Sequence, residues 1–250
     1  MPEAEFIWII GASDGIGAAL ARQWAGLGAR LVLSARNAAA LQDLAASLGP
    51  RHIALPLDVS DRASIDVAAR EIARIGPLDR VVNLAAIYDP GLIANLDPEV
   101  AGRIISVNLT GSFHIAQIGP RLLRKGGQLA LCGSVAGYIG LPQGQIYSAT
   151  KAAVINLTES LRAELAGHID VRLISPGFVD TRLTRRNDFT MPALMTPETA
   201  ARSIIDGLNR RGFEIHFPRR LTYALKLLRA LPYWAALPLT GRLLKKEIPS

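Results

Sequence analysis

Short, continuous apolar runs alternate with longer amphipathic stretches along most of the chain. Runs of this kind are typical of strands that are buried on both faces, and the longer stretches have the periodicity of helices. The predicted strands cover residues 6–10, 31–34, 52–57, 80–84, 128–132, 170–175 and 213–217. Helical patterns surround Ala18, Ala38, Ala63, Glu99, Tyr147 and Pro197. This alternation predicts an α/β protein with a doubly wound parallel sheet of about seven strands and helices on both faces.

The first predicted strand leads into a glycine-rich turn at residues 11–17, which is followed by a helical pattern over residues 18–27. Gly11 permits a tight turn, Gly15 lets the backbone approach a phosphate, and Gly17 lets the helix pack closely on the strand. The backbone amides at the helix N-terminus attract an anion. Because strand, turn, helix and second strand follow in order, the pattern predicts a dinucleotide site in a Rossmann-like fold.

The end of the second predicted strand favours NADP over NAD. It carries no carboxylate for the 2′-hydroxyl of NAD, whereas Arg36 offers a guanidinium to a 2′-phosphate. Asn37 adds a hydrogen-bond donor, and Ser13 lies near enough to contribute. Asp14 would repel the phosphate unless its side chain points outward or caps the following helix at Gly17.

Tyr147 and Lys151 stand four residues apart in a predicted helix over residues 145–157, so both side chains leave one face. The ammonium is expected to stabilise the phenolate and lower the pKa of the phenol, which makes Tyr147 a candidate general acid or base. Ser134 follows the strand predicted at residues 128–132, where hydroxyls commonly face a ligand crevice. The alternative is a half-buried phenol, a solvated lysine and a turn serine; the glycine-rich turn favours a shared site.

With these motifs, the chain resembles the short-chain dehydrogenase/reductase family over about residues 5–217. The family's catalytic tetrad matches Asn108, Ser134, Tyr147 and Lys151. Its adenine-binding pair matches Asp58 and Val59, and its nicotinamide-binding turn matches Pro176, Gly177 and Thr181. The resemblance implies NADP as the cofactor, in contact with Gly11, Ser13, Gly15, Ile16, Gly17, Arg36, Asn37, Asp58, Val59, Asn83, Ala85, Tyr147, Lys151, Pro176, Gly177, Val179 and Thr181.

The resemblance also implies an oxidoreductase that interconverts an alcohol and a carbonyl by hydride transfer. Tyr147 would exchange the proton, Ser134 would orient the substrate oxygen, and Lys151 would lower the tyrosine pKa and hold the ribose hydroxyls. Asn108 would support a water chain that runs through Lys151 to solvent. A homodimer or homotetramer is expected. The main rival is a protein that binds the cofactor without turnover, such as a redox-responsive regulator.

Two departures from the family pattern concern the cofactor site. Ile10 stands where the family has threonine, and the family's Asn-Asn-Ala-Gly stretch reads Asn83, Leu84, Ala85, Ala86 here. Leu84 lacks the hydrogen bonds of a second asparagine, and Ala86 adds a methyl group near the cofactor ribose. These changes affect the expected cofactor geometry and leave the expected fold intact.

Residues 184–195 show no clear periodicity and are rich in apolar side chains. In the family this stretch is a mobile lid over the substrate, so a hydrophobic substrate is expected, although a lid can also use such residues to pack shut. Thr196 and Pro197 then begin a helix. The candidate substrate contacts are Ser134, Tyr138, Tyr147, Phe178, Phe189, Met191 and Leu194.

Composition adds few further candidates. The single cysteine, Cys132, excludes an intramolecular disulfide and fits a reducing compartment. The four histidines show no ligand spacing, so no metal site is expected, and His114 and His216 are interpreted as structural. A strand that begins almost at Met1 leaves no room for a signal peptide, which predicts a cytoplasmic protein.

Positive charge is concentrated at the C-terminal end. Residues 210–250 hold nine Lys or Arg and two Glu, a net charge of +7, which equals that of the whole 250-residue chain. Basic residues alternate with leucines over residues 219–231, as in an amphipathic helix. Its apolar face could lie on a membrane surface, or it could cover the substrate cleft or a partner subunit. The nine basic residues are Arg210, Arg211, Arg219, Arg220, Lys226, Arg229, Arg242, Lys245 and Lys246.

The charges within this segment, together with Pro232 and Pro238, argue against a membrane-spanning helix. No aromatic platform or known module accompanies the charge, so nucleic-acid binding is not expected. A hydrophobic fraction of 50% is ample for one sheet that is covered on both faces. We therefore expect one NADP-binding catalytic domain over residues 1–218, extended by a basic amphipathic segment over residues 219–250. If that segment is the protein's main functional surface, a peripheral membrane interaction protein is the second rival.

Overall fold

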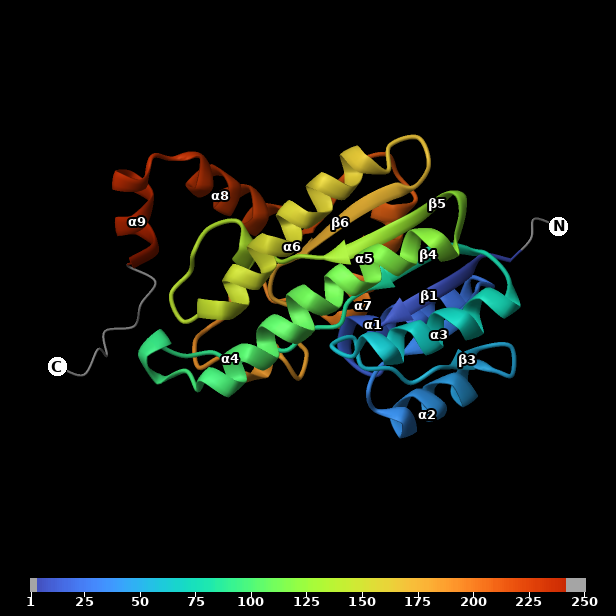
Figure 1. Ribbon diagram of the computed structural model, residues 1–250. Helices are drawn as coiled ribbons and strands as arrows, with labels where there is room; N and C mark the ends of the chain where they lie inside the picture. Colours follow the sequence, from blue (N-terminus) through green and yellow to red (C-terminus); the bar gives the residue numbers. More distant parts are fainter. Residues whose placement is uncertain (1–3, 242–250) are drawn as a thin grey trace.

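A seven-stranded parallel sheet forms the centre of the protein in a computed structural model that describes residues 4–241 (Figure 1). The strand order is β3-β2-β1-β4-β5-β6-β7, and each neighbouring pair is parallel. The strands are β1 Phe6–Ile10, β2 Arg30–Ser34, β3 Ile53–Ala54, β4 Leu78–Asn83, β5 Leu123–Cys132, β6 Asp170–Pro176 and β7 Glu214–Phe217. The predicted fold class, a Rossmann-like doubly wound sheet, is confirmed.

Helices cover both faces of this sheet (Figure 1). They are α1 Gly15–Gly26, α2 Ala38–Leu48, α3 Arg62–Ile75, α4 Pro98–Ile105, α5 Gly111–Leu122, α6 Gln145–Glu164, α7 Pro197–Leu208, α8 Arg219–Ala230 and α9 Tyr233–Gly241. One hydrophobic core lies between the sheet and α1, α2 and α7, and a second lies between the sheet and α3, α5 and α6.

The central strand β1 supplies side chains to both cores, because successive residues of a strand point to opposite faces. Ile7 and Ile9 belong to the first core, whereas Trp8 and Ile10 belong to the second. All five residues of β1 are buried, which is why the strand appears in the sequence as an unbroken apolar run.

Two predicted strands differ by more than two residues at one end from those in the structure, and the other boundaries differ by at most two residues. The predicted strand 52–57 pairs with β2 only at Ile53 and Ala54, because it lies at the sheet edge and then bends away toward α3. Its extended continuation is still tied to the sheet, since Leu55 N donates to Leu33 O within β2 at 2.8 Å and Leu57 N donates to Ala35 O just after β2 at 3.1 Å. β5 begins at Leu123 rather than at residue 128, because an irregular stretch joins it to β4 at Leu78.

The chain order reverses beside β1, with β2 and β3 on one side and β4 to β7 on the other. Ligands of open parallel sheets bind outside the carboxyl ends of the strands at such a switch point. The residues that follow β1, β4, β5 and β6 therefore meet in one region, and the predicted site residues come mainly from these four positions.

The C-terminal segment contains the predicted amphipathic helix, α8. Its inner face packs on the protein: Thr222 and Leu225 are buried, and Leu221 Cδ2 lies 3.0 Å from the position that a Cβ atom on Gly177 would occupy. Lys226 also forms an ion pair with Glu214 of β7. The inner face of α8 therefore packs on the protein itself, beside the predicted nicotinamide-binding turn at Gly177. Arg242, Lys245 and Lys246 lie outside the described residues. Within residues 4–241, no helix is long and apolar enough to cross a membrane.

Candidate active site

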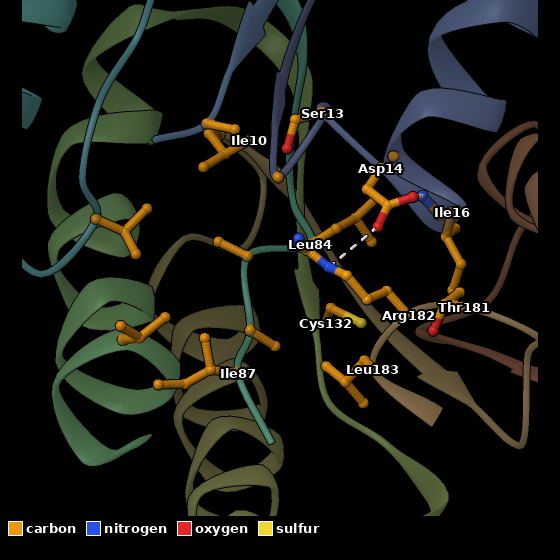
Figure 2. Close-up of a pocket in the computed structure, with 18 of the residues that line it drawn as sticks. Ile10, Ser13, Asp14, Ile16, Leu84, Ile87, Cys132, Thr181, Arg182 and Leu183 are labelled. Atoms are coloured by element: carbon orange, nitrogen blue, oxygen red, sulfur yellow. Dashed lines mark hydrogen bonds and ion pairs between the residues drawn. The ribbon is translucent and has the colours of Figure 1, made fainter. Parts of the chain in front are cut away.

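A cavity of about 680 Å³ opens at the carboxyl ends of the central strands (Figure 2). Its lining brings together most of the predicted site residues, from segments that are far apart in the sequence. These are Gly11, Ser13, Gly15, Ile16, Gly17, Arg36, Asn37, Asp58, Val59, Ala85, Ser134, Tyr147, Lys151, Pro176, Gly177, Val179 and Thr181. The predicted residues outside the lining are Asn83, Asn108, Tyr138, Phe178, Phe189, Met191 and Leu194.

The glycine-rich turn leaves space that only glycine provides. A Cβ atom on Gly17 would lie 2.0 Å from the carbonyl oxygen of Gly11, so the start of α1 can sit this close to the turn only without a side chain. Gly15 has a positive φ of 53°, and Thr181 Cγ2 lies 2.9 Å from where its Cβ would be. The turn is therefore a backbone cradle, open to the cavity, of the shape that a dinucleotide pyrophosphate needs.

Asp14 lies on the cavity wall, and its carboxylate has two partners. It caps α1, and its carboxylate accepts a hydrogen bond from the N–H of Gly15 at 2.7 Å, not from Gly17 as predicted. Its second oxygen lies 3.5 Å from the guanidinium of Arg182, on the loop that follows β6 (Figure 2). Because the Arg182 guanidinium pairs with the Asp14 carboxylate, the expected repulsion between Asp14 and a 2′-phosphate in this cavity is reduced.

Arg36 and Asn37 lie on the cavity wall beyond the end of β2. Arg36 is exposed and forms no ion pair with any described residue. The side-chain oxygen of Asn37 caps α2 by accepting from Ala40 N at 3.1 Å, which leaves the amide N–H₂ group as a donor. The two side chains together offer donors and a positive charge to an anion.

The three side chains with candidate chemistry converge on the cavity. Ser134 follows β5, and its hydroxyl accepts a hydrogen bond from Ala136 N at 3.1 Å. Tyr147 and Lys151 leave the same face of α6, as predicted, and the ammonium lies 5.6 Å from the centre of the phenol ring. The lysine is almost fully buried, and its ammonium donates to the carbonyl of Cys132 at 2.8 Å.

Burial dominates the ionisation of this pair. It raises the pKa of the Tyr147 phenol above its ordinary value, with a smaller opposing effect from hydrogen bonding to Ser134. Burial also lowers the pKa of the Lys151 ammonium. The predicted lowering of the phenol pKa by its cationic neighbour is thus not found, because burial disfavours the charged phenolate. The phenol holds its proton at neutral pH, as a general acid requires.

Asn108 lies behind the cavity wall, in a π-helical turn formed by Ser106–Thr110 between α4 and α5. Its side chain bonds both backbone groups of Ile87, at 2.9 and 3.0 Å, and donates to Thr150 Oγ1 at 3.3 Å. It thereby joins the loop after β4 to α6, one turn from Tyr147. This geometry holds two walls of the cavity together, and the water chain expected at Asn108 stays a prediction.

The departures from the family pattern have local effects. Asn83 is buried, with its oxygen accepting from Ala85 N at 3.2 Å, so it shapes the turn after β4 without reaching the cavity. Leu84 N donates to Ile10 O at 2.8 Å and keeps this turn tied to β1. The Leu84 side chain lines the cavity instead of bonding there (Figure 2).

The predicted substrate residues of the lid mainly contact one another. Phe178 packs edge-on against Phe189, with ring centres 5.7 Å apart, and Asn187 donates to the sulfur of Met191 at 3.2 Å. Leu194 is exposed. The rings of Phe178 and Phe189 therefore pack against each other, which is the alternative use predicted for apolar residues of the lid.

Tyr138 points away from the cavity toward the C-terminal segment. Its hydroxyl donates to Glu214, and the ammonium of Lys226 lies 5.6 Å from its ring centre. Burial and the Glu214 hydrogen bond raise the pKa of the Tyr138 phenol. Tyr138 therefore connects the loop after β5 to β7 and α8, and its role as a substrate contact stays a prediction.

His114 and His216, which were interpreted as structural, have polar partners within the fold. His114 Nδ1 lies 3.2 Å from Val59 O, and His216 Nδ1 lies 2.6 Å from Thr222 Oγ1. Among residues 4–241, no three His, Cys, Asp or Glu side chains are grouped so that they could hold a metal ion.

Tyr88 is a site residue that the sequence interpretation missed. Its ring lies 4.8 Å from the ring of Tyr147, centre to centre, and its hydroxyl donates to Asn187 Oδ1 of the lid at 2.9 Å. Arg186, the preceding lid residue, donates to the Tyr88 carbonyl at 2.7 Å. The sequence signal that could have identified Tyr88 was an aromatic residue shortly after the end of β4. Tyr88 links the lid to the candidate acid.

Tyr88→Phe is expected to raise the KM for substrate about two- to tenfold and to leave kcat within about twofold. The variant loses one neutral hydrogen bond to the lid, worth about 0.5–1.5 kcal/mol, but keeps the ring against Tyr147. Tyr88→Ala removes the ring as well and should lower kcat. Steady-state kinetics of both variants test this, and an equal fall of kcat in both would contradict it.

Comparison with known proteins agrees with this geometry. A model of the short chain dehydrogenase family matches residues 5–191. The chain is 38% identical over 177 residues to a sorbitol dehydrogenase of Cereibacter sphaeroides, a match that covers 69% of each protein.

Two solved structures share the fold over most of their length. A short-chain dehydrogenase from Sphingobium yanoikuyae in complex with NADPH is 27% identical, with a TM-score of 0.80 and 98% of each chain covered. An alcohol dehydrogenase from Thermococcus sibiricus complexed with 5-hydroxy-NADP is also 27% identical, with a TM-score of 0.77. That match covers 86% of this chain and 96% of the archaeal one.

Proposed function

This chain belongs to the short-chain dehydrogenase/reductase family, and we propose that it is an NADP-dependent oxidoreductase that interconverts an alcohol and a carbonyl on a hydrophobic substrate. The observation that carries the proposal is the convergence of Ser134, Tyr147 and Lys151 on the cavity that also contains the glycine cradle. A binding cradle alone would suit any nucleotide-binding protein, whereas a buried phenol beside a hydroxyl and an ammonium suits proton transfer.

The residues present fit a nicotinamide dinucleotide. The turn around Gly17 would hold the pyrophosphate, Asp58 the adenine end, and the segment from Pro176 to Thr181 the nicotinamide. Lys151 would hold the ribose hydroxyls through the ammonium that now bonds Cys132 O. When bound in its reduced form, the cofactor supplies the hydride for the carbonyl carbon.

Tyr147 would give its proton to the carbonyl oxygen, because burial keeps the phenol protonated at neutral pH. Ser134, at the end of β5, would donate a hydrogen bond to the same oxygen and orient it. Asn108 would position both by fixing the loop after β4 against α6. Ile87 and Leu183, which line the cavity, would contact the apolar part of the substrate.

The direct test is NADPH oxidation by the purified full-length protein against aldehydes, ketones, steroids and acyl substrates. Turnover of an apolar carbonyl compound is expected. Tight NADPH binding with no turnover on any class would favour the rival function, a cofactor-binding regulator. The substitutions at Leu84 and Ala86 are the observation on which that rival rests.

Arg36→Ala is expected to weaken NADPH binding roughly ten- to a hundredfold and to leave NADH binding unchanged. Loss of a hydrogen bond to a charged group costs about 1.5–3 kcal/mol, and only NADPH carries the 2′-phosphate. Arg70→Ala is the control, since Arg70 is an exposed arginine on α3 outside the cavity lining. Equal affinity of the wild type for NADPH and NADH would refute the preference and would identify Asp14 as the opposing residue.

We further propose, from the family resemblance, that the protein works as a homodimer or homotetramer in the cytoplasm. Light scattering of the purified protein measures the assembly directly. A monomer at micromolar concentration would overturn that part of the proposal without affecting the proposed reaction.

A further inference from the structure

The two C-terminal helices expose a group of large apolar and aromatic side chains, which we call the α8–α9 surface. Its members are Tyr223 and Leu227 on α8, and Tyr233, Trp234 and Leu237 on α9. Trp234 is 81% exposed and Leu227 is 68% exposed, although residues of these types are usually at least partly buried. No described residue covers them.

The α8–α9 surface lies on the outer side of two helices whose inner sides pack against the protein. On α8, Thr222 and Leu225 are buried, and Tyr223 and Leu227 follow on the opposite side. On α9, Ala236 and Thr240 are buried. The helices are therefore held in place by their own contacts, and the exposed side chains are not needed to keep them there.

The charge beside the α8–α9 surface has one sign. Arg219 and Arg220 are exposed at the start of α8, on the side of Tyr223 and Leu227, and form no ion pair with any described residue, whereas Lys226 is bound to Glu214. Neither helix contains an acidic residue. A partner that matches the α8–α9 surface must therefore combine negatively charged groups with an apolar region.

The geometry points to an anionic lipid bilayer as the partner, and we propose that the α8–α9 surface docks in its headgroup region. Trp and Tyr favour the boundary between headgroups and acyl chains, where Arg meets phosphate. A second copy of the chain would bring the same positive charge to an isologous contact, where like charges repel. Figure 1 shows both helices at the end of the molecule toward which the strands point. The proposal concerns binding alone and does not depend on the proposed reaction.

Vesicle sedimentation with the full-length protein tests the proposal. Binding is expected to vesicles of three parts phosphatidylcholine and one part phosphatidylglycerol at low salt, and not to phosphatidylcholine alone. Binding should weaken steeply between low and high salt, because the attraction between exposed charges is screened. Failure to bind the anionic vesicles at low salt would overturn the proposal.

Point variants separate the apolar and charged contributions; deletion of α8 would instead expose β7. Trp234→Ser should weaken vesicle binding roughly tenfold, since the indole buries apolar area in the lipid. Arg219→Gln and Arg220→Gln should each weaken it about fivefold at low salt. The matched controls are Leu27→Ser, which changes a 70% exposed leucine at the end of α1, and Arg70→Gln on α3.

Two outcomes would contradict the proposal even if the wild type binds vesicles. The first is an equal loss of binding in the controls and in the α8–α9 variants. The second is a change of oligomeric state in Trp234→Ser, measured by light scattering, with vesicle binding unaltered. That second result would assign the α8–α9 surface to a second copy of the chain. Unchanged NADPH affinity in every variant would show that each one is folded.

Discussion

Tyr147→Phe is expected to lower turnover by about 10²- to 10⁴-fold, the range that general acid catalysis contributes, while NADPH affinity stays near that of the wild type. The substitution removes one oxygen and keeps the ring that packs against Tyr88 at 4.8 Å. Neither the cradle nor the Lys151 ammonium is altered. Lys151→Ala should instead harm both turnover and binding, because its ammonium lies in the cavity and bonds the Cys132 carbonyl.

Single-turnover rates and NADPH titrations of both variants measure these effects. Tyr233→Phe is the control for a tyrosine far from the cavity. Because burial raises the pKa of Tyr147 above its ordinary value of 10.0, the protonated form persists below that pH. Loss of this proton should therefore not slow carbonyl reduction between neutral pH and about pH 9. A phenylalanine variant that retains more than a small fraction of the wild-type rate would exclude Tyr147 as the acid.

Gly17→Ala is expected to abolish tight NADPH binding and to lower the free energy of unfolding by about 3 kcal/mol or more. The new methyl group would lie 2.0 Å from the Gly11 carbonyl oxygen, so α1 must shift away from the turn. Overpacking against flexible side chains typically costs ~1–3 kcal/mol, and backbone yields less readily. The same shift would move the first-turn amides away from the pyrophosphate position.

Gly26→Ala provides a matched control in the same helix. Nothing lies within 4 Å of the Cβ position there, so its effect is limited to a change of helix propensity of less than about 1 kcal/mol. Thermal unfolding and NADPH titration compare the two variants. Wild-type affinity and stability in Gly17→Ala would show that the turn is looser than its geometry implies.

The sequence predicted the fold because its local signals agree with one another. The buried strand that ends at Ile10, the glycines that follow it, and the spacing of Tyr147 and Lys151 are each short-range patterns with a defined backbone consequence. The less reliable predictions concern edges, such as the extent of β3, where pairing depends on how the neighbouring chain bends.

Side-chain direction at the site was harder to predict, because it depends on contacts between distant segments. The sequence did not predict that the Tyr138 hydroxyl donates to Glu214 of β7. Asp14 was expected to oppose a phosphate, yet Arg182 lies beside it. The role of Tyr88 also depends on distant segments, because its hydroxyl bonds Asn187 of the lid and its ring lies against Tyr147 of α6. None of these partners lies within one turn of helix in the sequence.

The sequence by itself determined the fold class, the family and the order of the cofactor and candidate catalytic motifs, since each rests on residue type at short spacing. The tertiary structure alone decided the direction of the Tyr147 pKa shift, because its burial depends on distant segments such as those after β4 and β5. It also decided which leucines of α8 cover β7 and which, with Trp234, remain exposed. Helical periodicity places residues on a face, but only the packed neighbours determine whether that face is buried.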